Sequence, residues 1–135
     1  AVVAQRLVRT LCPHCREPYE VDLDQAASLG LTSAPGGAAY AAKAVLDANG
    51  GRAVLYRATG CEECDYSGYR GRTCILELLT LSDAMRKAVL AHADASELRQ
   101  IAASEGAISM YEDGILKALA GQTTVEEVKR ATSEA

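Results

Sequence analysis

Four of the five cysteines stand in two Cys-x-x-Cys pairs, Cys12 with Cys15 and Cys61 with Cys64. A tight turn within each pair can place two sulfurs on one side of a metal ion, and two such turns complete a tetrahedral site. Between the pairs lie 45 residues, more than the roughly 15–20 of a common zinc ribbon, so we expect an elaborated connection there. The pattern predicts a structural Zn²⁺ site whose four protein sulfurs leave no open position for a catalytic water.

Three other chemistries of paired cysteines are weighed against zinc. Disulfides require an oxidising compartment, and we expect this protein to be cytoplasmic, where thiols stay reduced. A thioredoxin-like redox motif uses one pair beside a parallel sheet, rather than two pairs that face each other. A rubredoxin-like iron site uses similar pairs, but the sequence here lacks the aromatic residues that we expect around such a centre. Structural zinc is therefore the preferred interpretation.

The other metal-binding or reactive side chains are better explained by structural roles. Cys74 is interpreted as a small apolar residue in a strand. His14 lies inside the first pair, where the two cysteines already fill the ligand positions, and His92 is expected on the surface near a helix end. Glu62 and Glu63 are interpreted as a solvated acidic turn, although four thiolates around one zinc ion would carry a net charge of about −2 that makes a second metal conceivable.

The charge of the chain disfavours nucleic acid as a partner. The formal net charge is −4, and no stripe of Lys and Arg of the kind that binds phosphates is present. The acidic excess lies in residues 74–135, which carry ten acidic and six basic side chains, whereas residues 1–73 carry eight of each. No apolar run approaches the ~20 residues that span a bilayer, and no signal peptide opens the chain. We therefore expect a cytoplasmic protein, and the start at Ala1 rather than Met predicts a fragment of a longer one.

Hydrophobic periodicity predicts the elements that position the cysteines. Residues 1–11 have apolar side chains at near-helical spacing, and we interpret them as the end of a preceding unit. Residues 38–48 are strong helix formers, followed by Asn-Gly-Gly, which suits a left-handed helix end. Alternation over 52–59 predicts a strand that leads into the second pair, and residues 74–79 predict another strand. The expected turn residues between that pair and the last strand are Ser67, Gly68 and Gly71.

Helical periodicity begins at Ser82 and continues to the end of the chain. Asp94 with Glu97, and Thr124 with Glu127, have the three-residue spacing of a helix capping pair. The helices are short enough that they must pack together to persist. The predicted fold is therefore α+β: a small zinc-stabilised module with short strands and an inserted helix, followed by a bundle of about four short α-helices. The other expected helix boundaries are Gly106, Ser109 and Gly121.

Several stretches of the sequence carry a family resemblance. They are AQRLVRTLCPHCREPY at 4–19, TGCEECDYSGYRGRT at 59–73, ELLTLSDAMRK at 77–87 and the long run at 96–132. In these stretches the chain resembles the C-terminal region of the bacterial type II secretion ATPases, whose superfamily also powers type IV pilus assembly. The resemblance is weakest across 20–58. It implies that a helical segment follows a zinc-binding tetracysteine element, whose ligands here would be Cys12, Cys15, Cys61 and Cys64.

The resemblance also implies the setting of the whole protein. Members of that family are cytoplasmic hexameric ATPases, attached to the inner membrane through N-terminal domains, that drive pseudopilus assembly for protein export. Residues 1–11 would then be the end of the ATPase core, residues 12–74 the tetracysteine module and residues 75–135 a helical subdomain. Arg6 or Arg9 could contact nucleotide or a neighbouring subunit, although a solvated or salt-bridged arginine is the preferred interpretation.

This sequence lacks the Gly-x-x-x-x-Gly-Lys-Ser/Thr loop that cradles a triphosphate and places Mg²⁺. We therefore expect no catalysis by this part of the protein, and ATP and Mg²⁺ to bind only in the full-length chain. The expected role is structural and coupling, with three partners: the ATPase core of its own chain, neighbouring subunits and the inner-membrane secretion platform. The alternatives are the corresponding part of a type IV pilus assembly ATPase, a stand-alone zinc ribbon that binds nucleic acid, and an iron electron-transfer domain.

Overall fold

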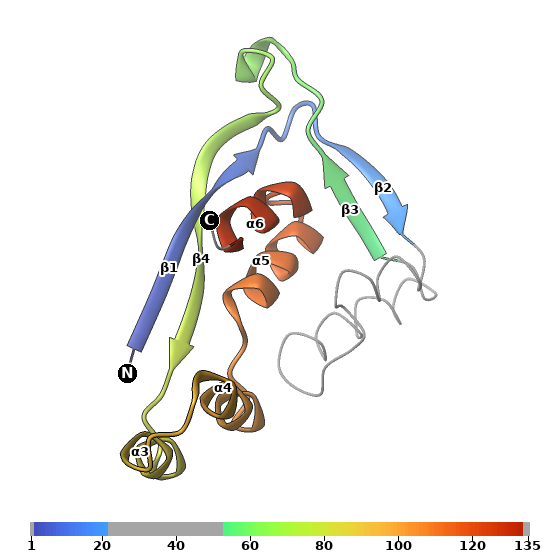
Figure 1. The fold of residues 1–135 in the computed structure, drawn as a ribbon. Helices are drawn as coiled ribbons and strands as arrows, with labels where there is room; N and C mark the ends of the chain where they lie inside the picture. Colours follow the sequence, from blue (N-terminus) through green and yellow to red (C-terminus); the bar gives the residue numbers. More distant parts are fainter. Residues whose placement is uncertain (1, 22–52, 134–135) are drawn as a thin grey trace.

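The structure, a computed structural model, describes residues 2–21 and 53–133. Two short antiparallel ribbons stand on either side of one helix pair, and a second helix pair lies at one end of the longer ribbon (Figure 1). This arrangement confirms the predicted α+β class. The elements are β1 (Val2–Leu11), β2 (Glu17–Val21), β3 (Ala53–Arg57), the 3₁₀ turn η1 (Glu62–Cys64), β4 (Tyr69–Leu79), α3 (Asp83–Leu90), α4 (Ala95–Ser104), α5 (Met110–Leu119) and α6 (Val125–Thr132).

β1 and β4 form the longer ribbon. Their antiparallel pairing begins with Val2 opposite Leu79, and the register shifts between Arg9 and Leu11 because β4 contains one extra residue there. Gly71 lies in this irregularity with φ of +82°. Glycine adopts such a positive φ at no steric cost, which is why it occurs in β-bulges of this kind.

The structure corrects the prediction for the first eleven residues. Their apolar spacing looks helical, but residues 2–11 form β1, because valine favours strands and antiparallel pairing with β4 gives alternate residues ladder hydrogen bonds. β4 in turn begins at Tyr69, earlier than the predicted strand over 74–79, because the bulge accommodates Gly71 within the strand. β4 thus runs across residue 74, the predicted boundary of the tetracysteine module, and the division into three domains stays a prediction.

β2 and β3 form the shorter ribbon, paired antiparallel from Glu17 opposite Arg57 to Val21 opposite Ala53. β3 confirms the strand predicted over 52–59. β2 is absent from the sequence-based prediction, because its alternation is hidden among acidic residues. The helix predicted over 38–48 lies outside the described residues.

All four predicted helix starts are confirmed by their N-terminal caps. A side-chain oxygen at each N-cap accepts a hydrogen bond from the backbone N–H three residues later, which satisfies a donor that has no partner within the helix. The positive φ values of Gly106 and Gly121, +87° and +80°, confirm the predicted ends of α4 and α5. The N-cap residues and the N–H donors are Ser82 with Met85, Asp94 with Glu97, Ser109 with Glu112 and Thr124 with Glu127.

Among the described residues, no helix combines the length and the apolar character that a membrane span requires.

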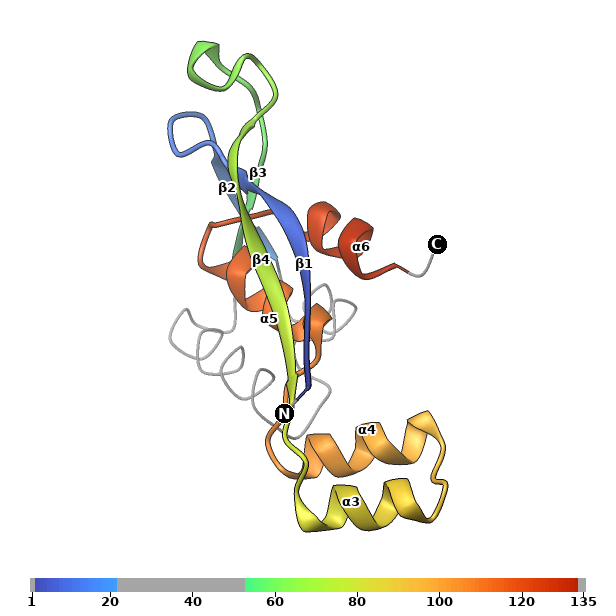
Figure 2. The same cartoon turned by 90° about the vertical axis from the view of Figure 1, so that its left-hand side faces the viewer.

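The core lies where α5 and α6 pack between the two ribbons (Figure 1). α5 and α6 approach closely at Gly114, where a Cβ atom would lie only 2.5 Å from Val128 Cγ1. α3 and α4 pack on each other at the far end of the β1–β4 ribbon (Figure 2). The helices therefore form two pairs. The buried residues of the larger cluster are Val21, Leu55, Ile115, Ala118, Val125 and Val128, and those of the smaller are Val8, Ile75 and Ala131.

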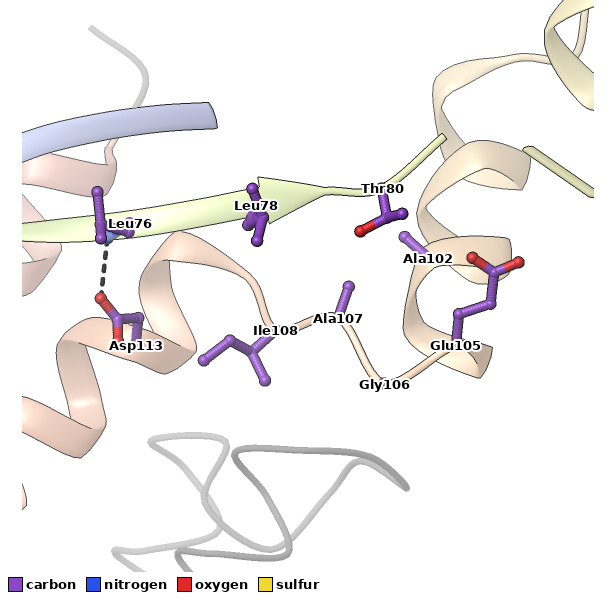
Figure 3. A pocket seen from close by; sticks show the side chains of 9 residues that line it. All are labelled: Leu76, Leu78, Thr80, Ala102, Glu105, Gly106, Ala107, Ile108 and Asp113. Atoms are coloured by element: carbon purple, nitrogen blue, oxygen red, sulfur yellow. Dashed lines mark hydrogen bonds between the residues drawn. The ribbon is translucent and has the colours of Figure 1, made fainter. Parts of the chain in front are cut away.

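Side chains of α5 bond to the backbone of β4. The Leu76 N–H donates a hydrogen bond of 2.8 Å to Asp113 Oδ2 (Figure 3). Lys117 Nζ donates to the carbonyl of Cys74. Asp113 and Lys117 also form an ion pair of 2.9 Å, one turn apart on α5. This helix thus supplies a donor and an acceptor to the strand, as a neighbouring strand would.

Candidate metal centre

The four paired cysteines converge, with their Sγ atoms all within 4.8 Å of one another. Three of the Sγ–Sγ separations are 3.8 Å: Cys12 to Cys61, Cys15 to Cys64 and Cys61 to Cys64. A tetrahedral zinc ion with Zn–S bonds of about 2.3 Å requires sulfurs about 3.8 Å apart. The cluster therefore has the dimensions of a four-thiolate metal site, and all four cysteines are free rather than disulfide-bonded.

Two loops at the end of the β1–β4 ribbon opposite the α3–α4 pair carry these cysteines (Figures 1 and 2). The first loop follows β1, and it is closed by a hydrogen bond of 3.1 Å from the Arg16 N–H to the Cys12 carbonyl. The second loop contains η1 and is closed by bonds to the Cys61 carbonyl from Cys64 N, at 3.2 Å, and Tyr66 N, at 2.8 Å. A bond of 3.0 Å from Cys12 N to the carbonyl of Gly68 joins the two loops.

Backbone N–H groups orient the sulfurs, as the outer partners of metal ligands do. Gly60 N donates to Cys15 Sγ at 3.4 Å, and both Cys61 N and Gly68 N donate to Cys64 Sγ at 3.2 Å. Gly60 has φ of +108°, and a Cβ atom there would lie 2.7 Å from the Tyr66 carbonyl oxygen. Only glycine brings its N–H this close to the sulfur without a clash.

The electrostatic environment differs between the thiols. Loss of water around Cys64 Sγ raises its pKa, but the N–H groups of Cys61 and Gly68 outweigh that effect and lower the pKa to about 6. Burial and the neighbouring Cys12 sulfur raise the pKa of Cys61 to about 12. A cation among these sulfurs would favour the thiolate at all four positions, because metal ligation requires deprotonated cysteine.

The other predicted candidates lie away from the sulfur cluster or at its solvent-facing side. Cys74 is in β4, as predicted, and is not a member of the cluster. His14 is exposed, and so is His92, which follows α3 with φ of +57°. Glu62 and Glu63 form an exposed turn, as predicted.

The sequence patterns did not indicate that Glu127 is a buried acid with arginine partners. Glu127 is 2% exposed, and its carboxylate accepts hydrogen bonds from Arg9 Nε and, at 2.6 Å, from Arg130 Nε. Arg9 also stacks over the Tyr69 ring, 4.0 Å from its centroid. The Thr124–Glu127 capping pair identified the backbone role of Glu127, but no local pattern indicates arginine partners so distant in the sequence. Arg9 is thus salt-bridged, in agreement with the preferred interpretation, and Arg6 donates to the Ala131 carbonyl at 2.8 Å.

A hollow of about 360 Å³ lies far from the cysteines, between the end of β4, α4 and the start of α5 (Figure 3). Leu76, Leu78, Ala107 and Ile108 are among the residues that line it. It contains none of the residues that the sequence indicates for chemistry, so the sulfur cluster remains the candidate functional site.

These features define a class of protein: an α+β module in which a four-cysteine cluster joins two loops at the end of a β-ribbon. Residues 1–130 match the model of a family described as "Type II/IV secretion system protein". The chain therefore belongs to the type II/IV secretion system protein family.

Relatives named for type II secretion and for type IV pilus assembly resemble the chain over 98% of its length. It is 46% identical over 135 residues to the type II secretion system protein E of Dickeya dadantii, covering 23% of that protein. It is 42% identical over 137 residues to the type II secretion system ATPase E of Vibrio cholerae, again covering 23%. It is 40% identical over 133 residues to the type IV pilus assembly ATPase PilB of Thermus thermophilus, covering 13%. The chain thus spans less than a quarter of each of these relatives.

Proposed function

We propose that Cys12, Cys15, Cys61 and Cys64 bind one structural Zn²⁺ ion. The observation that supports this most strongly is the mutual spacing of the four sulfurs, which matches a tetrahedral four-sulfur site. When bound, zinc supplies a strong cross-link between the two loops and no reactive position, because four protein sulfurs complete its coordination. The surrounding N–H groups of Gly60, Cys61 and Gly68 hold the sulfurs in place for the ion.

We further propose that the chain is the C-terminal part of an ATPase that powers pseudopilus assembly and protein export in type II secretion. The 46% and 42% identities to type II secretion proteins support this assignment. The full-length protein would be cytoplasmic, hexameric and peripheral to the inner membrane. The 40% identity to a pilus assembly ATPase supports a second candidate, the corresponding part of a type IV pilus machine.

Within such an ATPase, this part has a structural and coupling role rather than a catalytic one. The sequence contains no phosphate-binding loop, so the full-length protein would bind ATP and Mg²⁺ elsewhere. The partners that we propose are the ATPase core of the same chain, neighbouring subunits of the hexamer and proteins of the inner-membrane platform. Nucleic acid is not among them, since the net charge is −4.

Metal analysis of the purified chain tests the zinc site. We expect about one zinc per chain, and we expect the double variant Cys12→Ala, Cys15→Ala to lose both the metal and the fixed arrangement of the two cysteine loops. The matched control is Cys74→Ala, which removes a cysteine outside the cluster and should keep the metal. A folded wild-type chain that binds no zinc would overturn the zinc site. A coloured protein with bound iron would show that the four cysteines hold iron instead of zinc.

Three further measurements test the wider assignment. Measurable ATP turnover by this chain would overturn the claim that catalysis resides elsewhere. Binding of DNA at low salt would favour the nucleic-acid module instead. Restoration of protein export, but not of pili, by the full-length protein in deletion strains is the outcome expected for type II secretion, and the reverse outcome would favour the pilus machine.

A further inference from the structure

The residues on both sides of the first cysteine pair bond to one turn of the helical region. Leu11, which precedes Cys12, donates its N–H to the Gln122 carbonyl at 2.9 Å. Arg16, which follows Cys15, donates from Nη1 to the Gly121 carbonyl at 2.7 Å. These consecutive carbonyls belong to the turn between α5 and α6. The first cysteine loop is therefore attached to that turn at both of its ends.

Contacts at both the backbone and the guanidinium of Arg16 fix its position. Its backbone N–H is held by the Cys12 carbonyl at 3.1 Å, and its guanidinium lies over the Tyr56 ring, 4.7 Å from the centroid. Gly121 has φ of +80°, and a Cβ atom there would press against Arg16 Nη1 and lie 3.1 Å from Tyr56 Cε2. A shift of the cysteine loop must therefore move the turn or break the contact.

The second cysteine loop reaches the same place. Its last residue, Gly68, accepts the Cys12 N–H, and the hydroxyl of the next residue, Tyr69, lies 3.0 Å from Thr124 Oγ1. Thr124 is the N-cap of α6 and is 2% exposed. Its neighbour Thr123, fully buried, donates to the carbonyl of Arg9 in β1 at 2.8 Å. Both loops and β1 are thus connected to the turn from which α6 starts.

The other helix pair has no such connection. α3 and α4 are joined by a 2.6 Å hydrogen bond from Ser82 Oγ to Glu105 Oε1, and both lie at the opposite end of the ribbon (Figure 2). Between described residues, no hydrogen bond joins α3 or α4 to either cysteine loop.

We propose that metal binding at the four cysteines controls the stability and placement of the α5–α6 pair, through Arg16 and the turn at 121–124, while leaving α3–α4 independent. The inference rests on the proposed zinc site. The physical basis is mechanical: the cross-link fixes the first loop relative to the second, and both loops hold the turn from which α6 starts. The metal centre would thereby determine which part of the helical region is rigid.

Amide hydrogen exchange of the zinc-loaded chain, before and after removal of zinc with a chelator, tests the proposal. We expect the amides of α6 to exchange at least about tenfold faster after zinc removal, the effect of losing one charge-assisted hydrogen bond. Amides of α3 and α4 should change by less than about twofold. Faster exchange of α3–α4 by the same factor would show general unfolding and overturn the selective coupling.

The variant Arg16→Ala removes the proposed connection to the turn at 121–124 without removing a metal ligand. The variant should keep one zinc per chain, yet α6 should exchange about tenfold faster than in the zinc-loaded wild type. The matched control is Arg57→Ala, because Arg57 also lies over a tyrosine ring, Tyr19, at 4.7 Å, but belongs to β3 and not to a cysteine loop. Arg16→Lys, which keeps a donor and a charge, should give an intermediate effect and serves if Arg16→Ala does not fold.

The outcomes distinguish the two proposals. A folded wild-type chain that binds no zinc would overturn the metal site and the coupling together. A chain that binds zinc, but whose α6 exchange is the same with and without it, would overturn the coupling alone. Equal effects of Arg16→Ala and Arg57→Ala would exclude Arg16 as the connection.

Discussion

Glu127→Gln removes a buried negative charge from between two arginines while it keeps the size of the side chain. The carboxylate accepts from Arg9 and Arg130, whose side chains are 53% and 59% exposed, whereas its own side chain is 1% exposed. Glutamine retains one acceptor oxygen and turns an NH₂ donor toward the other arginine, so one bond is lost. Charge-assisted hydrogen bonds contribute about 1.5–3 kcal/mol each. Because both arginines can regain water, we expect a loss of about 2 kcal/mol in the free energy of unfolding, well below the cost of stranding a fully buried charge.

Urea denaturation of the zinc-loaded chain at neutral pH measures this loss. The matched control is Glu126→Gln, which makes the same change at the neighbouring, exposed position of α6 and should alter the stability by less than about 0.5 kcal/mol. Indistinguishable stabilities of the two variants would refute the expectation that the bonds of the Glu127 carboxylate to Arg9 in β1 and Arg130 in α6 stabilise the fold.

A comparison of the wild type with Glu127→Gln at different pH values tests whether the effect is ionic. Burial raises the pKa of Glu127, but the hydrogen bonds from Arg9 and Arg130 outweigh it, so the pKa in the folded chain is lowered. A lowered pKa contributes stability that is complete above the unfolded value of about 4.3 and is lost as the pH falls through the folded value. The difference between wild type and Glu127→Gln should therefore shrink below pH ~4. A constant difference down to low pH would contradict the ionic origin of the effect.

Two further substitutions test packing and capping, with stabilities again measured by urea denaturation. Gly114→Ala places a methyl group against Val128 Cγ1, and we expect a loss of about 1–3 kcal/mol; no loss would mean that the helices separate at little cost. Ser109→Ala removes the oxygen that accepts the Glu112 N–H at 3.1 Å and should cost about 1 kcal/mol; Ser104→Ala, at the exposed end of α4, is the control.

Local patterns predicted the features of this chain that depend on a few neighbouring residues. The helix starts at Ser82, Asp94, Ser109 and Thr124 were predictable because an N-cap is a contact between residues three apart. The four ligand candidates were predictable for a similar reason, since each Cys-x-x-Cys pair forms its own turn. That the two pairs meet could be inferred only from the chemistry of metal sites.

Features that depend on distant partners were not predictable in this way. Residues 2–11 form a strand because β4 pairs with them, although their own spacing looks helical. β2 exists because Tyr19 and Val21 pack with the core cluster, not because its local composition favours a strand. The partnership of Glu127 with Arg9 joins the two ends of the chain, 118 residues apart. No window of sequence contains both members of such a pair.

The bonds from Asp113 and Lys117 to β4 also affect how this strand edge can interact with other molecules. An open backbone N–H and carbonyl on the side of a strand form a template on which a second molecule can add its own strand. Here α5 occupies that template at Leu76 and Cys74. When α5 departs, the template is uncovered, so partial opening of this chain favours edge-to-edge aggregation. The helix that completes the core therefore also covers this part of the strand edge against pairing with a second molecule.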